Sequence, residues 1–236
     1  MSNRVPWSYH FGSWCVARQK KLRKSINRIN IYFDTLIKDH GLVRMLYPNR
    51  FRVSNQVFRS GHPNPIAVAR AGRKGIKTII NLRGQNDFSS NRLSTAACRK
   101  HGIKLIEFRA RSAKPPSKEM IHAAKELFER IEYPLLLHCK SGADRAGLMS
   151  ALYLIFHEKQ SVVDARKQLH WRYGHFRMSR SGILDNFFDS YEKDNGDKPI
   201  DFLSWIDEKY DPEALKAAFK GHKLANKFVD MILRRE

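Results

Sequence analysis

Short apolar runs alternate with helical patterns from residue 56 onward, and this alternation restricts the possible folds more than any other feature of the sequence. An order of strand, helix, strand, helix and strand is typical of an α/β domain, in which helices flank a mostly parallel sheet. We expect strands at 77–82, 104–108 and 134–138, and helices at 92–100 and 117–131. Ligands of such sheets bind beyond the carboxyl ends of the strands. A site is therefore expected directly after segment 134–138.

The residues after this last apolar run have the composition of an anion-binding loop. Segment 138–147, HCKSGADRAG, leads into a helix expected at about 143–158. The N–H groups and the dipole at a helix start favour an anion, and Gly142 lets the backbone approach a ligand closely. Arg145 can hold two phosphate oxygens with its planar guanidinium, and the same field favours the thiolate form of Cys139. We expect a phosphate to contact Lys140, Ser141, Gly142, Ala143, Asp144 and Arg145.

The pattern of His138, Cys139 and Arg145, with five residues between the last two, resembles the signature of the cysteine-dependent phosphatase superfamily. The chain is similar to compact, atypical dual-specificity phosphatases of bacterial type over roughly residues 47–191, with weaker matches at 58–63 and 81–84. The resemblance implies a tyrosine or dual-specificity phosphatase in which Cys139 forms a phosphocysteine, Arg145 stabilises the developing charge, and water releases phosphate. It implies no metal and no cofactor. His138, at a buried strand end, is expected to orient the loop.

The sequence departs from the resembled family at the proton donor. That family commonly uses an Asp on a loop upstream of the cysteine, but no Asp lies between residues 100 and 139. Glu107, at an expected strand end 32 residues before Cys139, is one candidate. Asp144 is the other, because myotubularin-like lipid phosphatases have an Asp immediately before the loop arginine. We favour Asp144 on this evidence.

Ala146 is a second departure, because the family commonly has a Ser or Thr at this position. The hydroxyl of that residue stabilises the thiolate as it leaves the phosphoenzyme. Ser141 is the nearest hydroxyl in the loop that can substitute in part. We therefore expect slow hydrolysis of the phosphoenzyme.

The charge is strongly asymmetric along the chain. The formal net charge is +21, and residues 1–120 carry 25 Lys and Arg against 5 Asp and Glu, whereas residues 181–236 carry 9 against 12. Such an excess predicts a polyanionic partner without choosing its class. We expect a basic N-terminal extension with an amphipathic helix (1–46), a phosphatase domain (47–193) and a helical C-terminal appendage (194–236) whose last helix spans about 213–235.

Several substrates and partners fit this charge. A phosphorylated protein, a phospholipid and an inositol phosphate are all compatible with the loop. Extension 1–46 combines aromatic residues with a basic helix, which is typical of a segment on an anionic membrane, but a helix packed on the domain fits equally well. A nucleic-acid-binding module is the alternative of another class, although no helix-turn-helix, zinc-finger or RNP pattern occurs.

The cysteine content and hydropathy bear on location. Three scattered cysteines form neither a disulfide framework nor a metal pair, which indicates a reducing, cytoplasmic setting. The longest apolar stretch, 148–156, is too short to span a bilayer, and no secretory signal is expected at the N-terminus. A cytoplasmic protein, in peripheral contact with the membrane if the extension binds there, is the expectation. The oligomeric state stays open.

Overall fold

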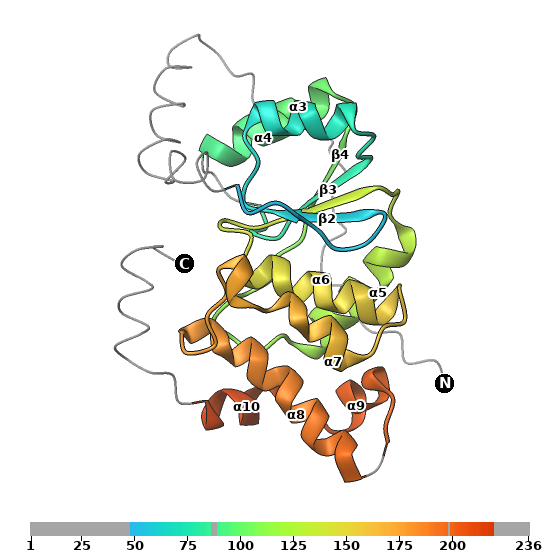
Figure 1. Ribbon diagram of the computed structural model, residues 1–236, viewed down its shortest axis with the longest axis vertical. Coiled ribbons are helices and arrows are strands. Elements are labelled where there is room, and N and C mark those ends of the chain that lie inside the picture. Colours follow the sequence, from blue (N-terminus) through green and yellow to red (C-terminus); the bar gives the residue numbers. More distant parts are fainter. Residues whose placement is uncertain (1–47, 86–88, 198, 220–236) are drawn as a thin grey trace.

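A five-stranded sheet with the strand order β1-β2-β5-β3-β4 forms the centre of the molecule (Figure 1). The computed structural model describes residues 48–85, 89–197 and 199–219. Neighbouring strands pair in parallel except β1 and β2, which are antiparallel. The strands are β1 (Phe51–Arg52), β2 (Val57–Ser60), β3 (Thr78–Asn81), β4 (Lys104–Glu107) and β5 (Leu135–His138). The mostly parallel sheet confirms the predicted α/β fold.

The registers bring the carboxyl ends of four strands to the same edge of the sheet. His138 ends β5 and pairs with Ser60 of β2 and with Asn81 of β3. Asn81 also pairs with Glu107 at the end of β4. Because neighbouring strands lie about 4.8 Å apart, Glu107 is roughly 10 Å from His138 across the sheet. The loop after His138 therefore starts in the middle of this edge.

Helices cover both faces of the sheet (Figure 1). The strand side chains alternate between the two layers: Ile79 and Leu136 belong to the smaller core, whereas Ile80, Leu135 and Leu137 belong to the larger one. The smaller core lies under α3 (Pro65–Arg73) and α4 (Ser89–Lys100), and the larger core under α5 (Lys118–Arg130) and α6 (Asp144–Phe156). The sheet is thus buried on both faces, which explains its nearly continuous apolar strands.

The sequence pattern at 162–173 predicts one continuous helix, but the structure divides this segment after α6. Helix α7 spans only Val162–Ala165, and 3-10 turns follow at Arg166–Gln168 (η1) and Trp171–Tyr173 (η2). The helix ends because Leu169 leaves the helical region with φ −96° and ψ 89°. His170 is extended, and its side chain accepts a hydrogen bond from the Arg172 N–H, which starts the second turn separately. The expectation of one helix was therefore wrong.

The C-terminal helices pack on the core. A 3-10 turn (η3, Arg180–Gly182) leads into α8 (Ile183–Asp197), which is followed by α9 (Phe202–Glu208) and α10 (Pro212–Ala218). Segment 192–199, EKDNGDKP, has a composition that predicts a break after a helix at about 181–193. Helix α8 instead continues past residue 193 and through much of this segment. Trp205 of α9 is buried in the larger core, and its Nε1 donates to Asp194 Oδ2 at 2.8 Å. Helix α10 ends at Ala218 because Phe219 is extended, so the single helix expected at about 213–235 was wrong at this point. Extension 1–46 and the rest of that expected helix, beyond residue 219, lie outside the described residues.

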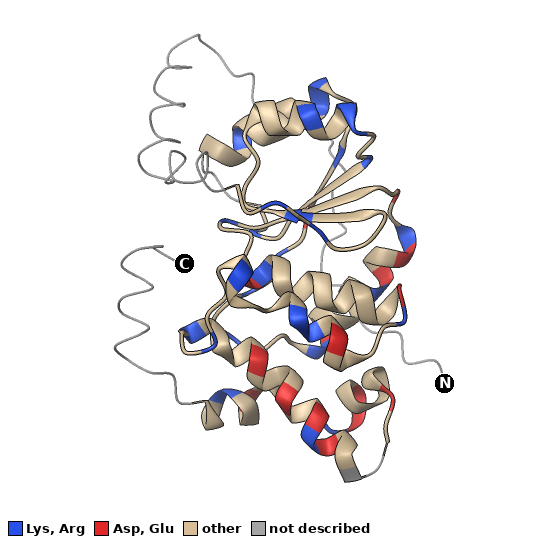
Figure 2. Cartoon of the chain, in the orientation of Figure 1, with Lys and Arg blue, Asp and Glu red and all other residues tan. Residues whose placement is uncertain are grey.

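The surface charge is divided between the two ends of the molecule. Figure 2 shows acidic side chains gathered on α8 and α9, whereas α3 and α4 carry Lys and Arg without acids. Within the described ranges, none of the helices combines the length and apolarity that a membrane-spanning helix requires.

Candidate active site

The loop at 139–143 joins β5 to α6 and curls around the sulfur of Cys139. Cys139 has 2% of its surface exposed, and its Sγ accepts a hydrogen bond from the Gly142 N–H at 3.2 Å. Gly142 has φ +79°, and a Cβ added there would lie 2.5 Å from the backbone nitrogen of Gly61. Only glycine combines this conformation with this close approach. The position of Gly142 therefore fixes the curl that directs an amide at the sulfur.

The start of α6 offers further donors beside Cys139. Ala143, at the N-cap position, forms no side-chain capping hydrogen bond, so N–H groups of the first turn lack that partner and the helix dipole favours an anion there. Arg145, in the first turn, is half-buried. Its guanidinium forms no hydrogen bond or ion pair with the rest of the described chain. The guanidinium is thus available to a ligand at the loop.

The carbonyl groups of the loop are held from outside by residues distant in sequence. Lys140 O accepts a hydrogen bond from the His62 N–H at 3.1 Å, and Ser141 O accepts one from Asn49 Nδ2 at 2.8 Å. Nη2 of Arg59 donates to Gly142 O at 2.8 Å and to Ala143 O at 2.7 Å. Four successive carbonyls therefore have a defined donor in the scaffold. His138 lies below them, with its Nδ1 3.4 Å from Cys139 O and its ring 4.7 Å from that of His62.

Arg59 is a buried cation directly behind the loop. It is fully buried, it lies 4.3 Å from the centre of the Tyr173 ring, and its Nη1 donates to the backbone and side-chain oxygens of Gln168. Burial lowers the pKa of Arg59 to about 10, against the opposing negative charge of Cys139. A pKa of about 10 keeps the guanidinium protonated at neutral pH. Arg59 is therefore a fixed positive charge on the scaffold side of Cys139.

Asp144 is engaged in a buried chain of three ionisable groups. Its Oδ1 is 2.7 Å from His175 Nδ1, and His175 Nε2 is 2.7 Å from Asp185 Oδ2 on α8. Burial alone lowers the pKa of His175, but the hydrogen bonds to Asp144 and Asp185 outweigh it and raise the pKa to about 9. His175 is thus protonated at neutral pH and pairs with two carboxylates. This arrangement disfavours Asp144 as a proton donor, because a carboxyl paired with a buried cation stays ionised.

Glu107, the other candidate proton donor, lies on the same sheet edge as the loop. Its Oε2 accepts a hydrogen bond from Asn81 Nδ2 at 2.7 Å. Although the residue as a whole is exposed, burial of its carboxyl raises the pKa of Glu107, against the hydrogen bonds from Asn91 and Asn81 that lower it. A carboxyl with a raised pKa retains its proton closer to neutral pH, as a general acid requires.

Comparison with known families agrees with this geometry. A family model described as a DSP-PTPase phosphatase fused to NAD+ kinase matches residues 51–183, more than half of the chain. The chain belongs to this DSP-PTPase family. The loop at 139–143, Arg59 and His175 all lie within the matched segment of the DSP-PTPase model, whereas Asn49 precedes it.

Individual relatives of the DSP-PTPase chain are more distant. It is 28% identical over 109 residues to the dual specificity protein phosphatase TpbA of Pseudomonas aeruginosa, covering 45% of the chain and 46% of TpbA. It is 31% identical over 102 residues to the inositol diphosphatase DSP4 of Arabidopsis thaliana, covering 41% of the chain and 50% of DSP4. The chain thus spans about half the length of the curated relatives it matches. The crystal structure of TpbA aligns with a TM-score of 0.49 and 22% identity, covering 72% of the chain and 89% of that structure.

The structure brings together most of the residues singled out from the sequence, and it adds others. Cys139 begins the loop at 139–143, and Arg145 lies in the first turn of the helix that follows this loop. Glu107 ends a strand on the same edge of the sheet. Sequence reasoning missed the scaffold donors Arg59 and Asn49. Arg59 belongs to the weaker family match at 58–63, and a buried arginine in a strand was a usable signal, whereas nothing in the local sequence marks Asn49.

The paired His175 gives a testable pH dependence of stability. The folded-state pKa of His175, about 9, exceeds its ordinary value of 6.5, so its contribution is fully present below pH 6.5 and is lost as pH rises through 9. We expect the free energy of unfolding to fall by about 3 kcal/mol over this range because of this group. Urea titrations of the wild type and of His175→Gln at pH 6, 7.5 and 9 measure the difference.

His122→Gln is the matched control, because His122 contacts Asp207 at 2.6 Å on the surface, where both side chains are exposed. The control is expected to retain the wild-type pH slope. Equal slopes for the wild type and His175→Gln would contradict the assignment of a protonated His175.

Proposed function

We propose that this DSP-PTPase family member hydrolyses phosphate monoesters through a phosphocysteine intermediate. The observation that carries the proposal is the loop after Cys139, in which the Gly142 N–H donates to Sγ at 3.2 Å, the start of α6 has no side-chain cap, and the half-buried Arg145 stands in the first turn of that helix. Amide N–H groups and a cation complement the charge on the oxygens of a transferring phosphoryl group. Its test is the direct detection of phosphate on Cys139.

The proposed reaction has two steps. In the first, the Cys139 thiolate attacks phosphorus, the S–P bond forms as the bond to the leaving oxygen breaks, and that oxygen takes a proton from an acid. Arg145 and the loop N–H groups stabilise the phosphoryl oxygens in this step. In the second step, water attacks phosphorus and gives a proton to the same acid residue, now ionised. The S–P bond breaks, the electron pair returns to sulfur, and inorganic phosphate leaves.

We assign the proton donor to Glu107 in place of Asp144, the residue that sequence reasoning favours. The raised pKa of Glu107 supports this role, and so does its position at the carboxyl edge of the sheet, beyond which ligands of such sheets bind. Asp144 instead holds the start of α6 to His175. Its proposed role is to fix the position of the loop.

The second step is expected to be the slower one. Ala146 is fully buried and offers no hydroxyl to the leaving thiolate. Rapid mixing with p-nitrophenyl phosphate should therefore give a burst of p-nitrophenol with an amplitude near the enzyme concentration, followed by a slow steady state. Acid quenching and mass spectrometry should find phosphate on the Cys139 peptide. Linear release from the first turnover without phosphorylated Cys139 would contradict the proposal.

For the physiological substrate we propose phosphorylated tyrosine, serine or threonine of proteins, in keeping with the name of the relative TpbA. A lipid or inositol phosphate is the second candidate, because the name of DSP4 points to inositol phosphates and one surface of this chain suits a membrane. Phosphate release from phosphotyrosine peptides and from vesicles carrying phosphatidylinositol phosphate, measured side by side, separates the two.

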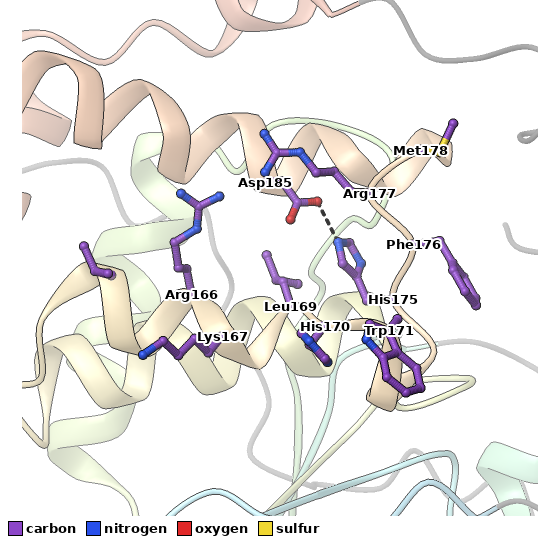
Figure 3. Close-up of a pocket in the computed structure, with 11 residues that line it drawn as sticks. Arg166, Lys167, Leu169, His170, Trp171, His175, Phe176, Arg177, Met178 and Asp185 are labelled. Atoms are coloured by element: carbon purple, nitrogen blue, oxygen red, sulfur yellow. Dashed lines mark hydrogen bonds and ion pairs between the residues drawn. The ribbon is translucent and has the colours of Figure 1, made fainter.

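That surface is an apolar patch made by Val163, Trp171, Phe176 and Met178. They are four of the five large apolar side chains that are exposed in the described part of the chain, and Trp171 is 71% exposed. They line one pocket with Arg166 and Lys167, and Figure 3 shows the two bases on the side away from Trp171, Phe176 and Met178. Exposed apolar side chains that share one pocket with bases suit the interface of an anionic bilayer.

The patch also lies next to the candidate site. Tyr173, at the end of the same turn as Trp171, accepts a hydrogen bond from Asn49 through its carbonyl, and the same Nδ2 group holds Ser141. For the second candidate, we infer that an anionic bilayer contacts the patch and presents the phosphate monoester of a lipid headgroup to the loop.

Vesicle sedimentation tests this inference. The double variant Trp171→Ser and Met178→Ser should bind phosphatidylglycerol vesicles at least roughly tenfold more weakly, given the apolar area it removes. Ile66→Ser is the matched control, since Ile66 is 61% exposed on α3, away from the patch, and should leave binding unchanged. Equal binding by all three proteins, or competition at the patch by a phosphopeptide alone, would overturn the membrane assignment.

A further inference from the structure

The peptide groups of the loop at 139–143 are held by hydrogen bonds to their carbonyl oxygens from the surrounding scaffold. In a planar trans peptide, the carbonyl of one residue and the N–H of the next point in opposite directions. A donor that holds a loop carbonyl outward therefore turns the following N–H inward. The scaffold holds the carbonyls of Lys140, Ser141, Gly142 and Ala143 in this way, and two side chains, Asn49 and Arg59, supply three of those four bonds.

Asn49 acts on the one peptide group whose N–H meets the sulfur. Its Nδ2 donates to Ser141 O at 2.8 Å, and the N–H at the other end of that peptide group, of Gly142, donates to Cys139 Sγ at 3.2 Å. Asn49 is 3% exposed and has φ +47°, a conformation that asparagine tolerates better than most residues. The peptide plane is thus held at both ends, by Asn49 outside and by the nucleophile inside.

Arg59 holds the next two peptide groups, which lead into α6. The Arg59 guanidinium donates to Gly142 O and Ala143 O, so the N–H groups at the other ends of these peptide groups, of Ala143 and Asp144, point away from the guanidinium. The Ala143 nitrogen lies 3.4 Å from Ser141 Oγ. A Cβ on Gly147 would lie 2.8 Å from Gln168 O and from Leu169 Cδ2, and 3.3 Å from Arg59 Nη2. The last glycine of segment 138–147 is therefore required mainly by the η1 segment that packs on it, and the guanidinium lies beside the same close contact.

The charge of Arg59 also points toward the site. In the described part of the chain, its hydrogen-bond partners are neutral oxygens, and none is a carboxylate. A fully buried cation without a carboxylate partner is unfavourable for folding unless another negative charge balances it. The ionisable groups that favour its charge are Cys139 first, and then Tyr173 and Asp144. A cation behind the loop would stabilise a thiolate at Cys139 and the phosphate of a substrate.

We propose that Asn49 and Arg59 are positioning residues of this site, which aim the loop amides at the sulfur and at the phosphoryl group. Neither touches the reacting atoms. Their effect on turnover rests on the proposed function, but their effect on Cys139 does not, because the reactivity of the thiolate can be measured without any substrate.

The experiment follows alkylation of Cys139 by iodoacetamide as a function of pH, with the Cys139 peptide quantified by mass spectrometry and Cys139→Ser as the blank. Asn49→Gly keeps the positive φ and removes the donor. It should shift the pH midpoint of alkylation upward by about one unit, as expected for the loss of one hydrogen bond that supports a charged group. Arg59→Lys keeps the positive charge but loses the planar guanidinium, which donates to two loop carbonyls at once. This variant should weaken the binding of orthovanadate roughly tenfold.

Thr78→Val is the matched control. Thr78 is fully buried, and its Oγ1 donates to Glu132 O at 2.7 Å at the opposite end of the sheet. It therefore loses one buried hydrogen bond to a carbonyl, as Asn49→Gly does, and it should lower Tm without moving the alkylation midpoint. If Asn49→Gly and Arg59→Lys lower Tm like Thr78→Val but leave alkylation and orthovanadate binding unchanged, both residues are structural only and the proposal is overturned. Shifted alkylation without phosphate release from any ester would instead refute the proposed function alone.

Discussion

Cys139→Ser is expected to abolish phosphate release, with a loss of roughly 10⁴-fold or more, while the fold persists. The loop directs the Gly142 N–H at the Cys139 sulfur, which is the proposed nucleophile. A serine hydroxyl at this position is not ionised at neutral pH and would attack phosphorus poorly. The Gly142 N–H, now 3.2 Å from Sγ, can still donate to the serine oxygen, so the loop should keep its curl. Release of p-nitrophenol and of inorganic phosphate measures the loss, and circular dichroism measures the fold.

Cys98→Ala is the control for this experiment. Cys98 is buried in the smaller core under α3 and α4, and burial raises its pKa to about 12, so it is a poor nucleophile. Its replacement should lower Tm slightly and leave turnover near the wild-type level. Activity that survives Cys139→Ser but disappears in Cys98→Ala would refute the assignment of the nucleophile.

Glu107→Gln is expected to lower kcat/KM on phenyl phosphate by roughly 10²- to 10³-fold, because kcat/KM reports the first step, in which the general acid acts. The loss of kcat/KM on p-nitrophenyl phosphate should be much smaller, because p-nitrophenolate leaves without a proton. The variant should also lose the limb of the pH profile at which rate falls as the acid ionises. The raised pKa of Glu107 places that limb above the pH at which an ordinary glutamate titrates.

Asp144→Asn separates this role from that of the neighbouring carboxylate. It removes the charge that pairs with His175 at 2.7 Å, so it should lower the free energy of unfolding and raise KM through a displaced loop. Its losses on the two esters should be equal, because proton donation is intact. If Asp144→Asn shows the dependence on the leaving group and Glu107→Gln does not, Asp144 is the acid after all.

The part of the site that could be predicted depends on residues that are consecutive in the sequence. Segment 135–145 contains an apolar strand, a short loop with glycine and a helix start. These three local signals together predict an anion site. The same holds for the sheet, whose apolar runs were visible in the sequence. Helix α3 was missed although Asn64, which caps it, and Pro65 in its first turn are local signals for a helix start.

The parts that could not be predicted depend on contacts between distant residues. Asp144 looked like a free acid because its partner His175 lies 31 residues away, and only the path of η2 brings the two together. The acidic stretch after residue 191 looked like a break in the sequence. Helix α8 nevertheless continues through it, because Tyr191 packs against Phe202 and Trp205 of α9. In both cases tertiary packing decided what local composition could not.

The long reach of these contacts bears on when the thiol becomes reactive during synthesis. Asn49 is 92 residues from its partner Ser141 and 124 residues from its partner Tyr173. His175 contacts Asp185, which follows all of these residues in the chain. Such contacts close late in folding, because the entropy of a long loop must be lost before they form. On the proposed function, we therefore expect Cys139 to react like any other cysteine in a nascent chain and to become a nucleophile only after these contacts have formed. A partly folded copy would then be protected from futile catalysis and from selective oxidation.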